Sequence, residues 1–182
     1  MSKDTRSQII ACAKRLVREQ GINRFTLADV AVAAGVSKGG LLYHFASKEA
    51  LVRSMLEDTF TTFSQRMREH TEQDDEAGRW ARGYIRATFT PNKNAGPDAA
   101  AALVAGIATD RTLLKAYADQ ARNWAAQLAA DDVDPVTVAV VQMAADGLWL
   151  NEALGLSPLS KDDRKRFIER LIDMTRPPPK ST

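Results

Sequence analysis

The sequence of 182 residues has few of the cysteine and histidine side chains on which many enzyme and metal sites depend. It contains one cysteine and two histidines, Cys12, His44 and His70, which lie far apart along the chain. A metal site needs several ligands close together, and a nucleophilic triad needs a histidine as its base. No glycine-rich phosphate loop follows a strand pattern either. We therefore expect a protein that is not an enzyme and that binds neither a metal nor a cofactor.

Long apolar runs are also missing from the sequence. No stretch reaches the length of about 18 apolar residues that suggests a transmembrane helix. The N-terminal residues MSKDTRSQ contain no apolar core of a signal peptide. A single cysteine excludes an internal disulfide, which suits a reducing compartment. We therefore expect a soluble, cytoplasmic protein.

The net charge is only +2, but the charge is unevenly distributed. Residues 1–48 contain 8 Lys or Arg against 3 Asp or Glu, a net charge of +5. Residues 49–182 contain 17 against 20, a net charge of −3. A positive N-terminal segment is what attraction to nucleic-acid phosphates requires. Ordinary variation of surface composition is the alternative explanation, so the charge alone identifies no partner.

Residues 26–48, TLADVAVAAGVSKGGLLYHFASK, contain two short helical patterns separated by a sharp turn. Thr26 and Asp29 form a capping-box pattern at the start of the first helix. Gly35 follows that helix, at a position where a left-handed turn favours glycine. Ser37 is a natural N-cap for the second helix. This layout is typical of a helix-turn-helix that reads duplex DNA in the major groove.

Two glycines stand in the first turn of the second helix, although each costs about 1 kcal/mol relative to alanine. We infer that this end of the helix approaches a large partner closely, as entry into a major groove requires. At least two of the three apolar residues Leu41, Leu42 and Phe45 should be buried in the core. Leu41 is the one that could lie at the surface instead and contact thymine methyl groups. The candidate DNA-binding residues are Thr26, Ser37, Lys38, Gly39, Gly40, Leu41, Tyr43, His44 and Lys48.

The residues SKGGLLYHFASKEAL, following TLADVAVAAGVS, resemble the DNA-binding segment of TetR-type repressors, in particular the multidrug-binding members. The resemblance covers about the first 55 residues, including a helical pattern that runs from a capping box at Thr5 to Gly21. Many relatives place Thr-Leu or Thr-Tyr where this chain has Gly40-Leu41, so one hydroxyl for a phosphate or base contact is missing. The resemblance implies a homodimer that binds a palindromic DNA operator and is released by a small-molecule effector, which we expect to be lipophilic or cationic.

Helical periodicity continues towards the C-terminus, and no strand pattern with period two occurs. We therefore expect an all-α chain of about nine helices, one of them in the alanine-rich run after Asp98. Residues 1–48 should form a three-helix DNA-binding head with the helix-turn-helix. Residues 49–182 should form a helical bundle for ligand binding and dimerisation.

The last two helices are expected to form the interface of the dimer. Asp134 and Pro135 begin a helix, VTVAVVQMAADGLWL, that is apolar on nearly every side. A chain this short can rarely cover such a helix alone, so part of its surface should meet another subunit. Ser160 with Asp163 opens the last helix. Two helices from each copy would form a four-helix interface, which the resemblance also implies.

Asp146 stands inside that apolar helix, where an unpaired ionised carboxylate is costly. A cationic effector is one explanation, and a pair with an arginine or a cap on a neighbouring helix is the other. Aromatic rings beside a carboxylate suit flat or quaternary cations. The candidate effector-binding residues are Trp80, Tyr84, Phe89, Trp124, Met143, Asp146 and Trp149.

Two other functions are compatible with the sequence. Arg79, Arg82 and Arg86 share a helical stripe that could hold an acyl-CoA or another anionic metabolite, although a solvated face explains them more simply. A DNA-binding protein with no ligand is the remaining alternative.

Overall fold

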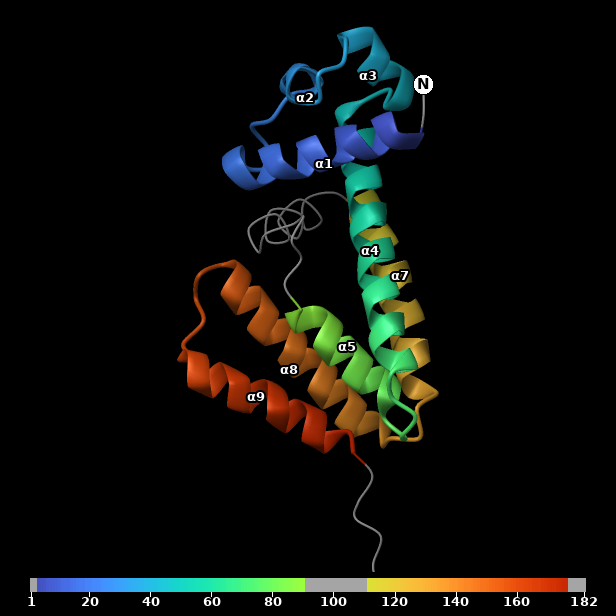
Figure 1. Cartoon of the computed structure of the whole chain (residues 1–182), viewed down its shortest axis with the longest axis vertical. Helices are drawn as coiled ribbons and strands as arrows, with labels where there is room; N and C mark the ends of the chain where they lie inside the picture. The colour runs from blue at the N-terminus through green and yellow to red at the C-terminus, as the bar shows by residue number, and fades with distance from the viewer. Residues whose placement is uncertain (1–2, 91–110, 177–182) are drawn as a thin grey trace, which may run out of the picture. The chain divides into compact units, whose positions relative to one another are not determined.

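The computed structural model describes residues 3–90 and 111–176, and within these ranges it contains helices and no strand (Figure 1). The expected all-α fold is thereby confirmed, while the helix expected after Asp98 lies outside the described residues. None of the described helices is long and apolar enough to cross a membrane. The helices are α1 (Lys3–Gln20), α2 (Leu27–Ala33), α3 (Lys38–His44), α4 (Lys48–Glu72), α5 (Arg79–Phe89), α7 (Arg111–Ala129), α8 (Pro135–Ala153) and α9 (Lys161–Met174).

The described chain divides into two compact units, with α4 and α7 contributing to both. The first unit holds residues 3–60 and 111–115, and the second holds residues 61–90 and 116–176.

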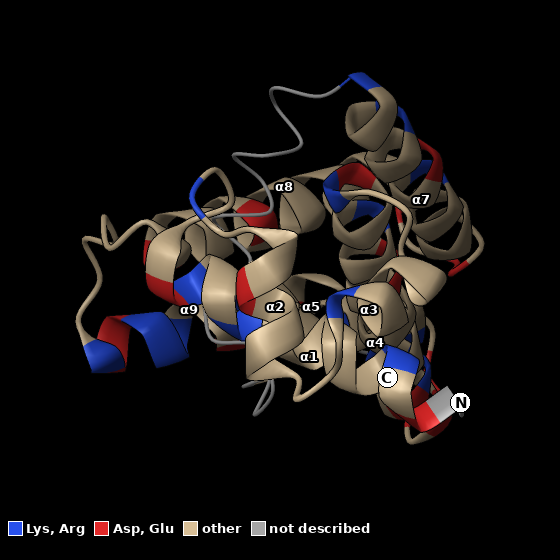
Figure 2. Cartoon of the chain, turned by 90° about the horizontal axis from the view of Figure 1, so that it is seen from above, with Lys and Arg blue, Asp and Glu red and all other residues tan. Residues whose placement is uncertain are grey.

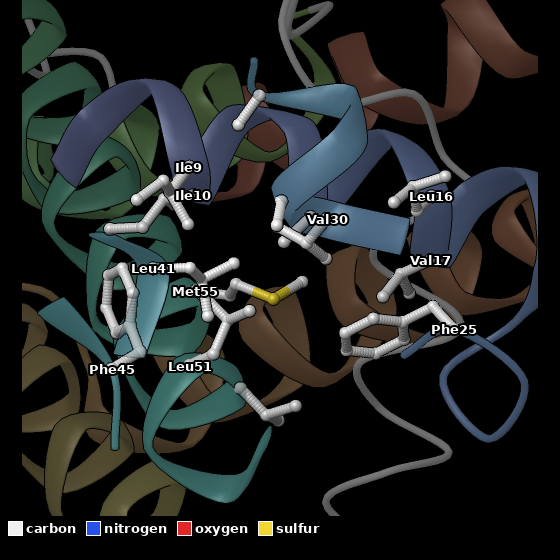
Figure 3. Packing of buried hydrophobic residues seen from close by; sticks show 14 of the residues in the cluster. Ile9, Ile10, Leu16, Val17, Phe25, Val30, Leu41, Phe45, Leu51 and Met55 are labelled. Atoms are coloured by element: carbon white, nitrogen blue, oxygen red, sulfur yellow. The ribbon is translucent and has the colours of Figure 1, made fainter. Parts of the chain in front are cut away.

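The first unit is built around an apolar core to which α1, α2, α3 and the beginning of α4 all contribute. Figure 3 shows Ile10, Val30, Leu41, Phe45 and Met55 among the side chains that gather there, and each is buried. Core side chains from four helices hold the two short helices α2 and α3, which are too short to be stable alone in water.

Local capping signals position α2 and α3 as the sequence predicts. The hydroxyl of Thr26 accepts a hydrogen bond of 3.2 Å from the backbone amide of Asp29, whose carboxylate accepts one of 2.9 Å from the Thr26 amide. The hydroxyl of Ser37 accepts from the Gly40 amide at 3.0 Å and begins α3. Between the two helices, Gly35 has a φ of +65°, in the left-handed region that favours glycine.

In the second unit, α5, α8 and α9 pack against one another. The hydroxyl of Ser160 accepts from the Asp163 amide at 3.1 Å and caps α9. The carboxylate of Asp134 accepts from the Thr137 amide at 2.8 Å and caps α8, whose first residue is Pro135. Both predicted helix starts are confirmed.

The start of α5 is capped from a distant part of the chain. The carboxylate of Asp131 accepts hydrogen bonds from the backbone amides of Trp80 at 2.7 Å and Ala81 at 3.0 Å. Gly78 precedes α5 with a φ of +86°, and a Cβ there would overlap the backbone oxygen of Thr175. This corner therefore needs glycine for its backbone conformation and for the close approach of the chain after α9.

The guanidinium of Arg82 is the centre of the same corner and is only 1% exposed. Its Nε and Nη2 donate to the two carboxylate oxygens of Asp74 at 2.7 and 2.6 Å. It also donates to the carbonyl oxygens of Ala77, Glu76 and Thr175 at 2.8, 3.1 and 3.1 Å. The hydrogen bonds from Arg82 to the Asp74 carboxylate hold the pKa of Asp74 well below its usual range. Arg82 thus joins the α4–α5 turn to the end of α9.

Candidate DNA interface and effector site

The outer face of α3 carries the side chains that are free to meet a partner. Lys38 and Gly39 are exposed, and the ring of Tyr43 is 78% exposed. Tyr43 contacts His44 edge to face with 5.3 Å between ring centroids. A phenol exposed to this extent is not held by the packing of the unit, which favours a role in contact over a role in the core.

Leu41 does not belong to this outer face, contrary to the sequence-based expectation. It is 0% exposed and lies in the core with Phe45, whereas Leu42 is 39% exposed. In α3 the inward direction is set by Leu41 and Phe45, four residues apart, and Leu42 points away from them. The expectation that two of the three apolar residues are buried is confirmed, and any contact with a thymine methyl group falls to Leu42 rather than Leu41.

Lys48 is the first residue of α4, and much of its hydrogen-bonding capacity is used within the unit. Its ammonium donates to the carbonyl oxygens of Phe25 at 2.8 Å and Asn23 at 3.3 Å and lies 4.3 Å from the centroid of the Phe25 ring. An ammonium has three donors, so one remains for a phosphate oxygen. Lys48 therefore supports the loop before α2 in addition to any role in binding.

Three other candidate side chains, those of Thr26, Ser37 and His44, differ in the hydrogen bonds that they form within the unit. The hydroxyl of Thr26 also donates to the carboxylate of Asp29 at 2.7 Å, so its donor is already used. The hydroxyl of Ser37 accepts from Gly40 and keeps its own proton for another acceptor. The Nε2 atom of His44 is buried and has no hydrogen-bond partner among the described residues. Of the three, Ser37 is the one with a free donor at the surface.

The carboxylate of Asp146 on α8 has a phenol as its partner. The hydroxyl of Tyr84 on α5 donates to it at 2.6 Å. Among the described residues, no lysine or arginine forms an ion pair with Asp146, and its carboxylate caps no helix. Burial raises the pKa of Asp146, so its charged form is disfavoured in the absence of a cation. The structure thus supports neither an arginine partner nor a cap for this residue.

Aromatic rings from three helices pack beside that hydrogen bond. Phe63 on α4 lies with its ring centroid 5.3 Å from Tyr84 and 4.7 Å from Trp124 on α7. The indole N–H of Trp124 donates to the hydroxyl of Ser64 at 2.9 Å. The charge of Asp146 also raises the pKa of Tyr117, after the larger effect of burial, which places this second phenol near the carboxylate.

The structure therefore brings together three of the predicted effector-binding residues, Tyr84, Trp124 and Asp146, and adds Phe63 and Tyr117. Sequence reasoning did not select the two additions. Phe63 and Tyr117 each belong to a helical pattern, and such a pattern does not indicate which side chains of other helices a residue meets.

The other predicted effector-binding residues have different surroundings. Phe89 at the end of α5 lies under the guanidinium of Arg164, 5.3 Å from its ring centroid. Met143 is 74% exposed, so it does not line an enclosed site within one subunit. Trp80 and Trp149 are half-buried, and the ring contacts found among the described residues beside Asp146 join Phe63, Tyr84 and Trp124.

The arginine stripe of α5 is not available for an anionic ligand, which corrects one of the alternatives. Arg82 is buried and bonded to Asp74. Arg86 donates to the same carboxylate at 3.2 Å. Arg79 alone is exposed. Arg82 and Arg86 thus both form ion pairs with Asp74 in the corner between α4 and α5.

One face of α8 remains uncovered within the single chain. Val136, Val140 and Met143 are exposed and follow one another at helical spacing, whereas Val138 and Val141 on the opposite face are buried. Figure 2 shows α8 mostly without charged residues, in contrast to α9, where lysine and arginine alternate with aspartate and glutamate. We call these three side chains the apolar strip of α8, and exposed apolar patches are a common feature of surfaces that bind a partner.

Two family models match this chain. Residues 9–55 match the family described as bacterial regulatory proteins, tetR family. Residues 78–176 match the family described as tetracyclin repressor-like, C-terminal domain.

Curated relatives match over a part of their length. Over 74 residues the chain is 36% identical to the HTH-type transcriptional regulator TtgR of Pseudomonas putida, and the match covers 41% of this chain and 35% of that protein. The chain thus spans about a third of the length of the curated relatives that it matches.

Solved structures match over nearly the whole chain. A putative transcriptional regulator from Saccharomonospora viridis, solved in complex with choline, has a TM-score of 0.78 at 18% identity, and the match covers 94% of this chain and 97% of the other. The multidrug binding protein EbrR, solved with malachite green, has a TM-score of 0.70 at 24% identity, with coverage of 94% and 98%. At these identities the likeness is one of fold.

Proposed function

The chain belongs to the TetR family of bacterial regulatory proteins, and on this basis we propose that it is a dimeric transcriptional repressor that binds a palindromic DNA operator and is released by a small cationic effector. The observation that carries the proposal is the outer face of α3. A helix-turn-helix held by a buried core presents Lys38 and Tyr43 outward on its second helix. This is the arrangement that a recognition helix needs to reach base edges and phosphates.

The proposed head comprises residues 1–48, and its charge supports binding to DNA. The excess of lysine and arginine in this segment gives a net charge of +5, whereas residues 49–182 carry −3. Neutralising DNA phosphates with such side chains releases counterions and contributes much of the affinity. The proposed body comprises residues 49–182 and carries both the dimer interface and the effector site.

The apolar strip of α8 supports dimerisation through the last two helices. Val136, Val140 and Met143 would be covered by the same surface of a second copy, as in a two-fold interface. Two heads related by a two-fold axis read two half-sites with the same sequence in opposite directions. A palindromic operator follows from this symmetry.

Asp146 supports a cationic effector over an anionic one. Asp146 is half-buried, and its carboxylate has a neutral phenol as its hydrogen-bond partner. A cation beside it would compensate the charge, and the nearby rings of Trp124 and Tyr84 suit a flat or quaternary cation. The choline and malachite green in the structures of the two fold relatives are cations of this kind.

The effector would act by shifting a population of conformations. One state of the dimer binds the operator better, and the effector prefers the other, so each ligand lowers the affinity of the other. A protein of this fold that binds DNA without any effector is the alternative, and it would show no such linkage.

The proposal is tested by an unbiased selection of duplexes from random oligonucleotides with the full-length protein at low salt. We expect enrichment of an inverted repeat whose half-sites lie about one helical turn apart or a multiple of it. Enrichment of a single half-site would contradict the dimer, and no enrichment of any duplex would contradict DNA recognition itself.

A further inference from the structure

The outer face of α3 has a position without a side chain at Gly39. A Cβ added there would meet no atom of the described residues within 4 Å, and the backbone of Gly39 is helical rather than left-handed. Glycine is nevertheless among the least favourable residues in a helix. Neither the backbone conformation nor the packing of the described residues therefore requires glycine at this position.

Two exposed side chains stand beside the empty position. Leu42 and Tyr43 lie three and four residues after Gly39, so they are its neighbours on the helix surface. Both are exposed, whereas Leu41 points into the core. An aliphatic side chain and an aromatic ring thus flank a position with no Cβ, and we call the three residues Gly39, Leu42 and Tyr43 the notch.

The edges of the base pairs in the major groove are mainly hydrogen-bonding groups, and their characteristic apolar group is the C5 methyl of thymine. We propose that the notch receives the C5 methyl group of one thymine in each operator half-site. The inference rests on the proposed DNA-binding function and assigns to Gly39 the choice of a methylated pyrimidine at that position. A larger residue would occupy the space that the methyl group needs.

The test removes a methyl group from the DNA in one experiment and adds a methyl group to the protein in another. In the duplex selected by the wild-type protein, each symmetric pair of thymines is replaced in turn by deoxyuridine, which removes only the C5 methyl group. For one pair we expect binding to weaken by about fourfold for each half-site, the effect of exposing one buried methyl group.

Gly39→Ala places the methyl group on the protein instead. It should bind the thymine duplex at least about tenfold more weakly, as with a mismatched base pair, and should prefer the deoxyuridine duplex.

Lys38→Ala is the matched control, because it truncates the neighbouring exposed residue of the same helix. It should weaken binding to both duplexes by the same factor, keep the preference for thymine, and reduce the salt dependence by about one phosphate contact. Gly39→Ala should leave the salt dependence unchanged. It should also raise the Tm by about 2–4 °C, because alanine favours the helix, so its weaker binding is not due to unfolding.

The two possible failures are distinguishable. If Gly39→Ala keeps the wild-type preference for thymine, or if no thymine pair affects wild-type binding, the notch does not receive a methyl group, although DNA binding stands. If the wild-type protein enriches no duplex, the proposed function itself is wrong.

Discussion

The phenol of Tyr84 on α5 donates a hydrogen bond of 2.6 Å to the carboxylate of Asp146 on α8. Burial raises the pKa of Tyr84, and the charge of Asp146 raises it further, so the phenol stays protonated and remains the donor. The carboxylate is thus held by a neutral group, and its charge is left without a counter-ion among the described residues. Asp146 therefore costs free energy in the ligand-free fold, and it is the group to which we propose that a cationic effector binds.

The first prediction is that Asp146→Asn stabilises the ligand-free protein at pH 7. The amide oxygen still accepts from Tyr84, while the buried charge is removed. The folded-state pKa of Asp146 lies above its unfolded value, so wild-type stability falls as the pH rises from about 4 through the folded-state pKa. Thermal unfolding of both proteins between about pH 4 and pH 7 should show an advantage of the variant that grows with pH. A constant difference would contradict this account.

The second prediction is that the same variant loses its response to cations. Tetraphenylphosphonium should raise the Tm of the wild-type protein and release it from the selected operator, because binding to one state stabilises that state. Asp146→Asn should show neither effect. Asp119→Asn, which removes an exposed carboxylate from α7, should respond as the wild type does. The neutral triphenylphosphine oxide should have no effect on any of the proteins, and equal responses to it would exclude a role for charge.

The third prediction concerns the buried corner around Arg82. Arg82→Met should lower the free energy of unfolding by about 3 kcal/mol, because it removes two hydrogen bonds to Asp74 and the hydrogen bonds to three carbonyl oxygens in a buried corner. Arg122→Met is the control, since Arg122 forms an exposed pair with Asp119. Its effect should stay within about 0.5 kcal/mol. Urea denaturation measures both, and similar small losses would show that the corner contributes little to stability.

The fourth prediction concerns the apolar strip of α8. Val140→Glu should shift the protein from dimer to monomer at micromolar concentration, because a charge would be buried in the proposed interface. Ala125→Glu, at an exposed position of α7, should leave the assembly unchanged. Sedimentation velocity distinguishes the two outcomes, and a wild-type protein that sediments as a monomer would remove the interface from the account.

The helix starts that depend on local signals could be predicted from the sequence. The capping hydroxyls of Thr26, Ser37 and Ser160 each bond to a residue three positions later, so a short window of sequence contains the whole interaction. The start of α1 was less accurate, because the helix begins at Lys3, before the predicted cap at Thr5. The directions of the side chains of α3 were predicted in part, since periodicity in a helix of seven residues did not distinguish Leu41 from Leu42.

Contacts between distant parts of the chain could not be predicted in this way. Arg82 and Thr175 are 93 positions apart, and no pattern near either residue indicates the other. The arginines of α5 therefore resembled an anion-binding stripe, although the structure pairs two of them with Asp74. For the same reason the contact of Phe63 with Tyr84 was missed. A helical pattern gives the buried face of a helix but not the helix that covers it.

The most direct measurement of the central claim, that the outer face of α3 reads DNA, is a titration of the selected operator and of a scrambled duplex with wild-type protein and Tyr43→Ala. Fluorescence anisotropy of the labelled duplex reports both affinities. We predict that the wild-type protein prefers the operator by about 1,000-fold or more, and that Tyr43→Ala loses at least about tenfold of this preference with an unchanged Tm. If Tyr43→Ala binds the operator as tightly and as selectively as the wild type, the outer face of α3 does not read DNA through this residue and the account is contradicted.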